Sequence, residues 1–354
     1  MIISRAKNIE EMPMTNFTAV GRPTPLADGR AKVTGATRFT SDLQLPGMLH
    51  ARFVTSIYAH ANLRRIDSSA AMAVPGVAAV LTAKDLPDIA PSSRSRLLLA
   101  RGRVVFMGQP VAMVLAMNEA AAEDGAQKVV VDYEPLPAAI TMDDSLTENA
   151  PLVWSEGAPG GSEEAGAHGG DVGGESATQR KKGNIAGEAS FKRGDVAAGF
   201  AEADVIIEGT FTTPMVHQSA VEPRGVIAAP TTDSQWAYGN APPLSSPLAG
   251  GTERGGMSIW ACTQNPFGVR REVAEVLGVP ETSVRVQGMA VGGGFGSKFG
   301  LYEPLVAVAA RAVNRPVSGR TVRWGLTRDS AATNGGTRPV SAPEGDRRLR
   351  PSDQ

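Results

Sequence analysis

The sequence is poorest in cysteine, with Cys262 as the single thiol among 354 residues. One thiol cannot form an internal disulfide, and it cannot supply the set of cysteine ligands that an iron–sulfur cluster requires. The four histidines show no zinc-type spacing such as H-E-x-x-H. Any redox metal is therefore expected inside an organic cofactor or on another chain.

Charge of one sign and long apolar runs are also lacking. The 35 basic and 36 acidic residues leave a net charge of −1, which provides neither a field for nucleic acid nor a polybasic patch for a membrane surface. No apolar run approaches the ~18–20 residues of a membrane span. Residues 1–7 show neither the apolar core of a signal peptide nor a twin arginine. The sequence thus predicts a cytoplasmic protein that binds no nucleic acid and no membrane.

Length predicts two or three domains, and local composition indicates two units with loose segments around them. Glycine, glutamate and serine dominate the stretch after residue 155, and such a segment cannot bury enough apolar area to offset its ordering entropy. The predicted parts are a flexible leader, a first α/β unit, a second unit with two loose inserts, and a disordered tail: 1–20, 21–140, 141–327 (inserts 156–187 and 231–256) and 328–354.

Hydrophobic periodicity and breaker residues predict the elements of the first unit. Asn118 is expected to cap a helix over 119–127. A Gly108-Gln109-Pro110 turn between two apolar runs predicts a hairpin of 103–106 with 111–116. The other predicted elements are strands and one short helix: strands 48–57, 77–81 and 128–133, and helix 70–74.

The same signals run through the second unit. Asp195 is expected to cap a helix over 196–203, and Gly278 with Pro280 to end a helix over 268–277. The remaining predictions are strands at 204–212, 225–229, 257–262 and 283–287, and a helix at 304–313.

Three successive glycines, Gly292–Gly294, stand between a predicted strand and a predicted helix. Glycine tolerates positive φ and lets a ligand lie against the backbone, and bare N–H groups near Lys298 would suit an anion or a polar cofactor. Phe295 would then be held on a bare main chain. From this motif alone, a plain glycine turn is an equally good interpretation.

Gln264 ends a predicted strand just before a helix. Its amide can donate and accept hydrogen bonds without titrating, which would suit an oxo or hydroxyl group of a cofactor. The stretch also fits an ordinary helix start, with Asn265 as the cap and Pro266 at the first helical position. Spacing alone favours the ordinary helix start.

The segment His217–Arg224 combines an imidazole, a carboxylate and a guanidinium. It could form the wall of a polar site, but a Glu222–Arg224 pair beside a strand start is the favoured interpretation. His60 is expected to be structural, and Cys262 to be a small core residue. The sequence contains no Walker loop and no G-x-S-x-G elbow.

Taken together, the motifs resemble the molybdenum hydroxylase large subunits, the family of xanthine dehydrogenase, aldehyde oxidoreductase and carbon monoxide dehydrogenase. Glu222-Pro223-Arg224, Thr263-Gln264-Asn265-Pro266 and Gly292–Gly296 follow in the family's order, and Gln264 and Phe295 have the family's spacing. The resemblance covers roughly residues 20–155 and 184–327. Its earlier marks are Asp28–Gly35, Phe39–Asp42, Leu45–Leu49, Gly108–Ala112 and Val131–Pro137.

The resemblance implies an α+β fold in which an α/β hammerhead domain precedes the first molybdopterin-binding domain. It implies a molybdopterin cofactor carrying molybdenum, expected in its cytosine dinucleotide form. The family hydroxylates carbon centres with oxygen from water and passes the electrons to [2Fe–2S] clusters and FAD. With one cysteine here, these electron carriers are expected on a [2Fe–2S] subunit and an FAD-binding subunit, and not on this chain.

Carried over by residue, the resemblance places Gln264 against the oxygen ligand shell of molybdenum. Phe295 would pack beside the metal where the substrate lies. Gly293, Gly294 and Gly296 would offer backbone contacts to the cofactor. No residue is expected to bind the metal directly, because the pterin holds it.

Three departures from the family pattern shape the expectation. Phe299 occupies the place where purine-binding members carry a glutamate, so xanthine is disfavoured. The family's large subunit is about twice this length, and the half without a counterpart includes the glutamate that serves as general base. The sequence beyond Asn334 no longer resembles the family, which suggests a truncated or frameshifted gene or a split subunit.

The sequence is therefore interpreted as the N-terminal half of such a subunit, serving oxidation of an aldehyde, carbon monoxide or an N-heterocycle. It is expected to be inactive alone, and a separate chain could supply the other half. The alternative is a non-catalytic gene remnant, or a scaffold that binds hydroxylase partner subunits. A generic phosphate-binding module ranks lowest, because Walker spacing is absent.

Overall fold

The computed structural model describes residues 21, 23–88, 98–154, 183–185, 193–211, 218–231, 255–299 and 302–320. The chain divides into two units, residues 1–38 and 39–354. In the first unit the described residues form one short helix, α1 (Gly29–Val33), with an Asp28–Lys32 ion pair of 2.7 Å. The predicted leader and tail, and nearly all of the two predicted inserts, lie outside the described residues.

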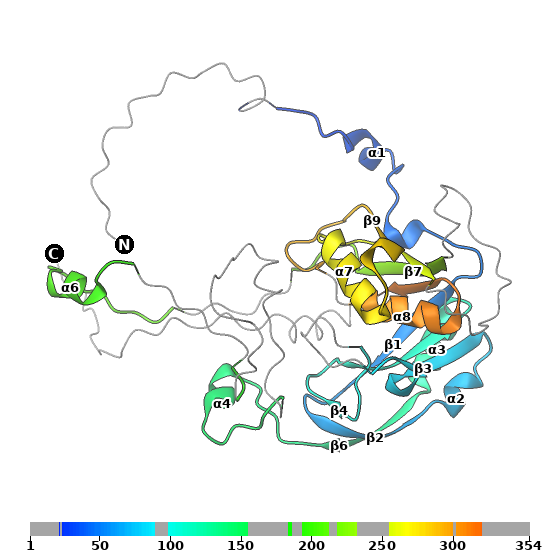
Figure 1. Ribbon diagram of the computed structural model, residues 1–354, viewed down its shortest axis with the longest axis horizontal. Helices are drawn as coiled ribbons and strands as arrows, with labels where there is room; N and C mark the ends of the chain where they lie inside the picture. The colour runs from blue at the N-terminus through cyan, green and yellow to red at the C-terminus, as the bar shows by residue number, and fades with distance from the viewer. Residues whose placement is uncertain are drawn as a thin grey trace, which may run out of the picture. The chain divides into compact units, whose positions relative to one another are not determined.

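A seven-stranded sheet forms the centre of the second unit (Figure 1). The β1–β10 and β8–β9 pairs are parallel and the other neighbours antiparallel. Both halves of the chain supply strands, and they meet where Leu49 of β1 pairs with Val317 of β10. In spatial order the strands are β3 (Val77–Thr82), β5 (Pro110–Ala116), β1 (Leu49–Thr55), β10 (Val317–Arg320), β7 (Gly225–Thr231), β8 (Gly256–Ala261) and β9 (Val284–Gly288).

Helices cover both faces of this sheet. Along β5, Met113 and Leu115 join the largest core cluster with residues of helix α8 (Glu303–Val313), whereas Ala116 joins residues of helix α3 (Glu119–Gln127). Successive side chains of a strand point to opposite faces, so α8 and α3 lie on opposite sides. Every residue of β5 is buried as a result, which explains its unbroken apolar sequence.

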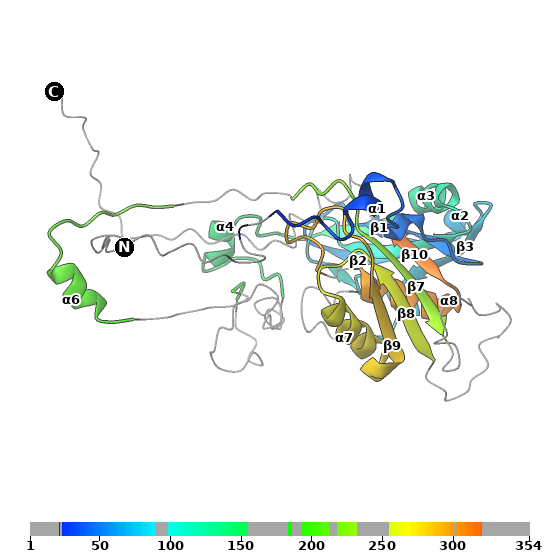
Figure 2. The ribbon, with the colours of Figure 1, turned by 90° about the horizontal axis from the view of Figure 1, so that it is seen from above.

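The second half of the sheet packs against α7 (Pro266–Leu277) and α8, with the 3₁₀ turn η4 (Glu281–Ser283) leading into β9. Figure 2 shows β10, β7, β8 and β9 running side by side. Helix α8 lies so close to the sheet that a Cβ on Gly319 would approach Val306 Cγ2 to 2.5 Å. Glycine at this position therefore permits the close approach between helix and strand.

A second, three-stranded antiparallel sheet corrects the predicted hairpin. The run near residue 103 forms β4 (Arg103–Val104), which pairs with β2 (Ala61–Asp67), and β2 pairs in turn with β6 (Val130–Pro135). The other expected arm, β5, belongs to the large sheet. The hairpin prediction was wrong because Val104 forms its backbone ladder with Ala61 of β2, and β4 meets β5 only through side-chain packing of Val104 with Val111.

Several local predictions are confirmed. Asn118 Oδ1 accepts a hydrogen bond from Ala121 N (2.8 Å) at the start of α3, and Asp195 Oδ1 accepts one from Ala198 N (3.1 Å) at the start of α6 (Val196–Ala201). The predicted strand 204–212 is not confirmed, because residues 205–210 have no regular secondary structure. The remaining short helical elements are α2 (Ser69–Met72), α4 (Met142–Leu146), η1 (Thr40–Asp42) and η2 (Ala83–Asp85). Among the described residues no helix is long and apolar enough to cross a membrane.

Candidate functional site

The glycine-rich loop after β9 adopts an unusual backbone. Gly293 and Gly296 have φ values of 98° and 84°, and Phe295 between them has a φ of 49°. A bulky residue in the left-handed region is strained, and such strain persists only where the surroundings fix it. Phe295 is nevertheless 72% exposed. The loop therefore presents an aromatic ring outward from a strained main chain.

Gln264 lies directly against this loop. A Cβ on Gly294 would fall 2.5 Å from Gln264 Cδ, so the amide occupies the space that glycine leaves open. Gln264 N donates to Lys298 O (2.7 Å), and Lys298 N donates back to Gln264 Oε1 (3.2 Å). Because Oε1 is already an acceptor in this bond, the Nε2 amide is the group that Gln264 can offer to a ligand.

The expected helix start coexists with this arrangement. Asn265 Oδ1 accepts a hydrogen bond from Gly268 N (3.0 Å), and Pro266 begins helix α7. The capping interpretation of this stretch is confirmed. It does not compete with a ligand-binding role, because the cap uses the side chain of Asn265 and leaves Gln264 facing the loop. A binding role for Gln264 stays a prediction.

Glu222 pairs with Lys298, which corrects two expectations. The Lys298 Nζ to Glu222 Oε2 distance is 2.7 Å, and the two side chains are 1% and 12% exposed. The ammonium group is thus enclosed and bound, not open to an anion beside the loop. The favoured Glu222–Arg224 pair is also wrong, since Glu222 turns toward Lys298 and Gly292, and Arg224 Nε is buried without a hydrogen-bond partner in the described part of the chain.

Cys262 lies in the core beneath the same site, as the sequence predicts. Its side chain is 3% exposed, and Gly225 N donates to its Sγ at 3.1 Å. Burial raises the pKa of the thiol, which the Gly225 hydrogen bond offsets only in part. The thiol is therefore held protonated and is poorly suited to act as a nucleophile or metal ligand.

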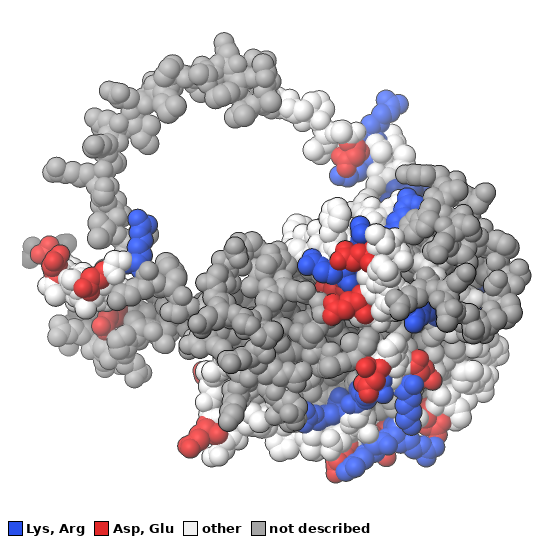
Figure 3. Space-filling view, in the orientation of Figure 1, with Lys and Arg blue, Asp and Glu red and all other residues white. Residues whose placement is uncertain are grey.

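Metal-binding side chains do not gather anywhere among the described residues, where no group of three or more His, Cys, Asp or Glu could hold an ion. His60 Nδ1 lies 2.6 Å from Pro137 O, in keeping with a structural histidine. His217 lies outside the described part of the chain. On the face drawn in Figure 3, acidic and basic side chains are interspersed among the residues that are coloured.

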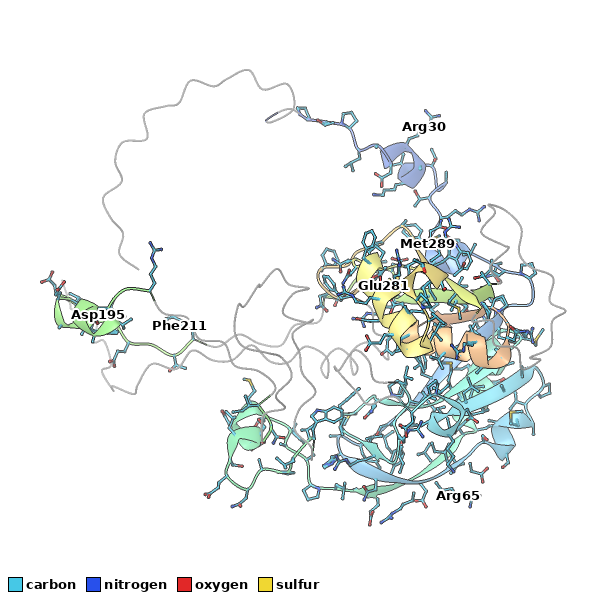
Figure 4. The ribbon with its side chains drawn as sticks, in the orientation of Figure 1. Arg30, Arg65, Asp195, Phe211, Glu281 and Met289 are labelled. Carbon is cyan, nitrogen blue, oxygen red and sulfur yellow. The ribbon has the colours of Figure 1, made fainter. Side chains whose placement is uncertain are left out.

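The site is thus assembled from three segments distant in sequence: the end of β8 with Gln264, the loop Gly292–Lys298 after β9, and Glu222 ahead of β7. Figure 4 labels Met289, where the chain leaves β9 toward the loop. Met289 N donates to Ala261 O at 2.9 Å, which ties the start of the loop to β8. The sequence predicts that Gln264 and Phe295 share a site, but nothing in it indicates the Glu222–Lys298 pair.

Two family models match the chain. Residues 34–137 match the aldehyde oxidase and xanthine dehydrogenase a/b hammerhead domain, and residues 177–238 with 248–341 match the molybdopterin cofactor-binding domain. The chain therefore has the expected α+β fold, an α/β hammerhead domain followed by a molybdopterin-binding domain. Gln264, the glycine-rich loop and Lys298 all fall within the second match.

Relatives with assigned names agree with these matches. The chain is 32% identical to the carbon monoxide dehydrogenase large chain of Afipia carboxidovorans, over 82% of this chain and 32% of that one. The structure is similar to quinoline 2-oxidoreductase from Pseudomonas putida 86, with a TM-score of 0.63, 28% identity, and 85% and 34% of the two chains covered. It is also similar to reconstituted carbon monoxide dehydrogenase from Oligotropha carboxidovorans, with a TM-score of 0.63 and 28% identity. That similarity covers 86% of this chain and 35% of the other. The chain spans about a third of the length of the curated relatives it matches.

Proposed function

This chain belongs to the molybdenum hydroxylase large-subunit family, and from that premise we propose that it forms part of the molybdopterin cradle of an oxidoreductase acting on a small molecule. The observation that carries the proposal is the contact between the Gln264 amide and Gly294. It joins a hydrogen-bond donor to a glycine-rich loop in which Gly294 is buried against the amide, Gly293 is half-buried and Gly296 is exposed, and a polar, oxygen-rich cofactor needs such donors beside accessible main chain. A cytoplasmic location belongs to the same proposal.

The residues present fit such a group. Gly294 has no Cβ, and the space that one would fill is occupied by Gln264, whose Nε2 amide donates in no hydrogen bond within the described residues. We assign Gln264 the role of donor to an oxygen of the cofactor. The backbone of Gly293, Gly294 and Gly296 would line the cofactor, and the exposed ring of Phe295 would orient the substrate.

When bound, the molybdenum cofactor supplies the two-electron chemistry that inserts oxygen from water into the substrate. This chain's residues hold and orient, and none of the described residues is assigned as the general base. Phe299 cannot give a purine a charged hydrogen bond, so an aldehyde, carbon monoxide or another N-heterocycle is the proposed substrate. Electrons would leave through a [2Fe–2S] subunit and an FAD subunit, and the pterin would carry cytosine dinucleotide.

The test measures molybdenum per chain by elemental analysis after expression in a host that makes the cofactor. The chain alone is expected to retain little molybdenum and to show no turnover, because general-base assistance is worth ~10²–10⁴-fold. Co-expression with the polypeptides encoded beside it should raise the metal content toward one per chain. Stoichiometric molybdenum and dye reduction by an aldehyde with the chain alone would contradict the expected inactivity.

A matched pair of variants separates cofactor binding from general stability. Gln264→Met removes the proposed donor, whereas Gln287→Met changes another exposed glutamine, on strand β9. In the co-expressed complex, Gln264→Met should lose most of the molybdenum and Gln287→Met should retain it. Equal retention in both variants would remove the assigned role of Gln264, and a complex without molybdenum in any form would favour a non-catalytic scaffold.

A further inference from the structure

The buried pair of Glu222 and Lys298 reaches both ends of the glycine-rich loop. At one end, Glu222 Oε2 accepts a hydrogen bond from Gly292 N (2.6 Å), and Glu222 N donates to Gly292 O (3.3 Å). At the other end, Lys298 Nζ reaches the same carboxylate oxygen at 2.7 Å. One carboxylate therefore joins the first and last residues of a loop that carries Phe295 between them.

Lys298 also holds Gln264 through its main chain. Its carbonyl oxygen accepts hydrogen bonds from Gln264 N (2.7 Å) and Thr263 Oγ1 (3.3 Å), and its N–H donates to Gln264 Oε1 (3.2 Å). A displacement of the Lys298 backbone would therefore move the Gln264 amide as well. The side chain of Lys298 determines where that backbone lies, because its ammonium group is fixed to Glu222.

A pair enclosed in this way is unlike a surface ion pair. The two side chains are 1% and 12% exposed, so removing either charge leaves the other buried without compensation. The surface pair of Arg52 with Glu123 (2.6 Å, side chains 26% and 41% exposed) offers a contrast within the same chain. Surface pairs contribute little because solvent screens them.

We propose that the Glu222–Lys298 ion pair is a positioning device that closes the Gly292–Lys298 loop and fixes the Gln264 amide in its donor orientation. This inference rests on the proposed function, because fixing the Gln264 amide matters only if that amide binds the cofactor. Its geometric content concerns only the chain itself and is testable without cofactor.

The experiment is hydrogen exchange on the purified, cofactor-free chain. Three loop amides are hydrogen-bonded within the site, those of Gly292, Ser297 and Lys298. Lys298→Met should speed their exchange by at least about tenfold, because the stranded carboxylate favours local opening. Peptides from helix α7 should exchange as in the wild type. Glu123→Gln, which breaks the surface pair, should leave the loop unchanged.

Glu222→Gln and the double variant Glu222→Gln/Lys298→Met separate charge pairing from packing. A glutamine at position 222 can still accept the hydrogen bond from Gly292 N, and the double variant has no stranded charge. The double variant should therefore recover most of the loop protection lost in Lys298→Met. If Lys298→Met and the double variant lost the same amount of loop protection, the proposal would be overturned. A uniform increase in exchange rate throughout α7 and the loop would overturn it as well.

The Gln264 amide provides a spectroscopic signature. With ¹⁵N-glutamine labelling, its side-chain signal is assigned by its disappearance in Gln264→Met. Lys298→Met should shift and broaden this signal, while that of Gln109, whose Oε1 likewise accepts a main-chain N–H (Val105, 2.8 Å), should stay in place. An unchanged Gln264 signal would overturn the proposal whatever the molybdenum analysis shows. Conversely, if the signal moved in the purified chain while the co-expressed complex never bound molybdenum, that result would refute the proposed function and leave the positioning role intact.

Discussion

Gly294 and Gln264 occupy one small volume at the residue scale, so each constrains the other. The atoms that a Gly294 Cβ would meet are the end of a flexible side chain, Gln264 Cδ at 2.5 Å and Oε1 at 2.6 Å. A larger residue can therefore be accommodated by rotating Gln264 away. Such a change would leave the fold intact while removing the hydrogen bond to Lys298 N.

Gly294→Ala is accordingly expected to cost only about 1 kcal/mol in the free energy of unfolding, the worth of one hydrogen bond. In the co-expressed complex it should nevertheless reduce molybdenum content as strongly as Gln264→Met. Urea unfolding and elemental analysis measure the two effects. Gly288→Ala is the control, because a Cβ there meets nothing within 4 Å. Full molybdenum in Gly294→Ala would contradict the expectation.

Cys262 gives a pH prediction. Burial raises the pKa of its folded-state thiol above the ordinary value of 9.0, so the unfolded thiol ionises first as pH rises. The stabilisation is complete below pH 9.0 and is lost as pH rises through the folded-state pKa. The free energy of unfolding should fall more steeply above pH 9.0 in the wild type than in Cys262→Ala. If the free energy of unfolding varied with pH in parallel for the wild type and Cys262→Ala, this prediction would be wrong.

The same burial governs thiol reactivity. In the folded chain at pH 8, Ellman's reagent should react with Cys262 much more slowly than in urea, because only an accessible thiolate attacks. The release of the coloured product measures the rate. Equal rates in the folded and unfolded chain would show that the thiol is not enclosed.

At this scale, a family resemblance can link residues that are distant in sequence, whereas local sequence patterns cannot. Gln264 and Phe295 could be paired because a resemblance supplied a spacing. The Glu222–Lys298 contact joins residues 76 positions apart, and nothing in the local pattern of either residue indicates its partner. Because Arg224 is an opposite charge only two positions from Glu222, the sequence favoured a Glu222–Arg224 pair, which the structure does not contain.

At the scale of elements, helix α7 begins directly beside the site. The Asn265 cap satisfies Gly268 N, one of the amides that the first helical turn leaves without an intrahelical partner. The start of the helix and the direction of Gln264 are therefore set within two consecutive residues. A substitution that removes the Asn265 cap is therefore expected to disturb the orientation of Gln264 as well.

Asn265→Ala should cost about 1 kcal/mol in the free energy of unfolding, with Asn265→Asp close to wild type because its carboxylate can cap the same N–H. Asn118→Ala removes the corresponding cap of α3 and is the matched control. Both alanine variants should be destabilised alike in urea unfolding, but only Asn265→Ala should broaden the ¹⁵N signal of Gln264. Broadening in both would point to a general loss of order.

Element predictions held where a local signal was complete. Asn118 with its helix, and Pro266 with Gly278 at the ends of α7, carry start and stop chemistry in the sequence itself. The hairpin prediction failed because two apolar runs about a turn look alike whether they pair with each other or enter different sheets. Strands β2 and β10 were not predicted, since their pairing depends on partners far along the chain.

At the scale of the whole second unit, the two family domains share one sheet. Strands β3, β5 and β1 lie within the hammerhead match, and β10, β7, β8 and β9 within the molybdopterin-binding match. Met113 and Leu115 of the first pack in one core cluster with α8 of the second. The domain boundaries inferred from sequence stay a prediction, while the core crosses between the two matches.

A fragment of residues 39–140 is therefore expected to lack an independent stable fold. It would leave the β1 edge unpaired and expose Leu49, Met113 and Leu115, which are fully buried in the whole chain. Size-exclusion chromatography should show aggregation, and urea should produce no cooperative transition. A monomeric fragment with a sharp transition would show that the hammerhead part folds without its neighbour.

The central β1–β10 seam has a consequence during synthesis. Leu49 leaves the ribosome 268 positions before Val317, its register partner. At about 5–20 residues per second, roughly 13–54 s pass between synthesis of β1 and synthesis of its partner strand β10. During that interval the incomplete sheet exposes an unpaired apolar edge, so we expect ribosome-associated chaperones to bind this polypeptide while it is being synthesised.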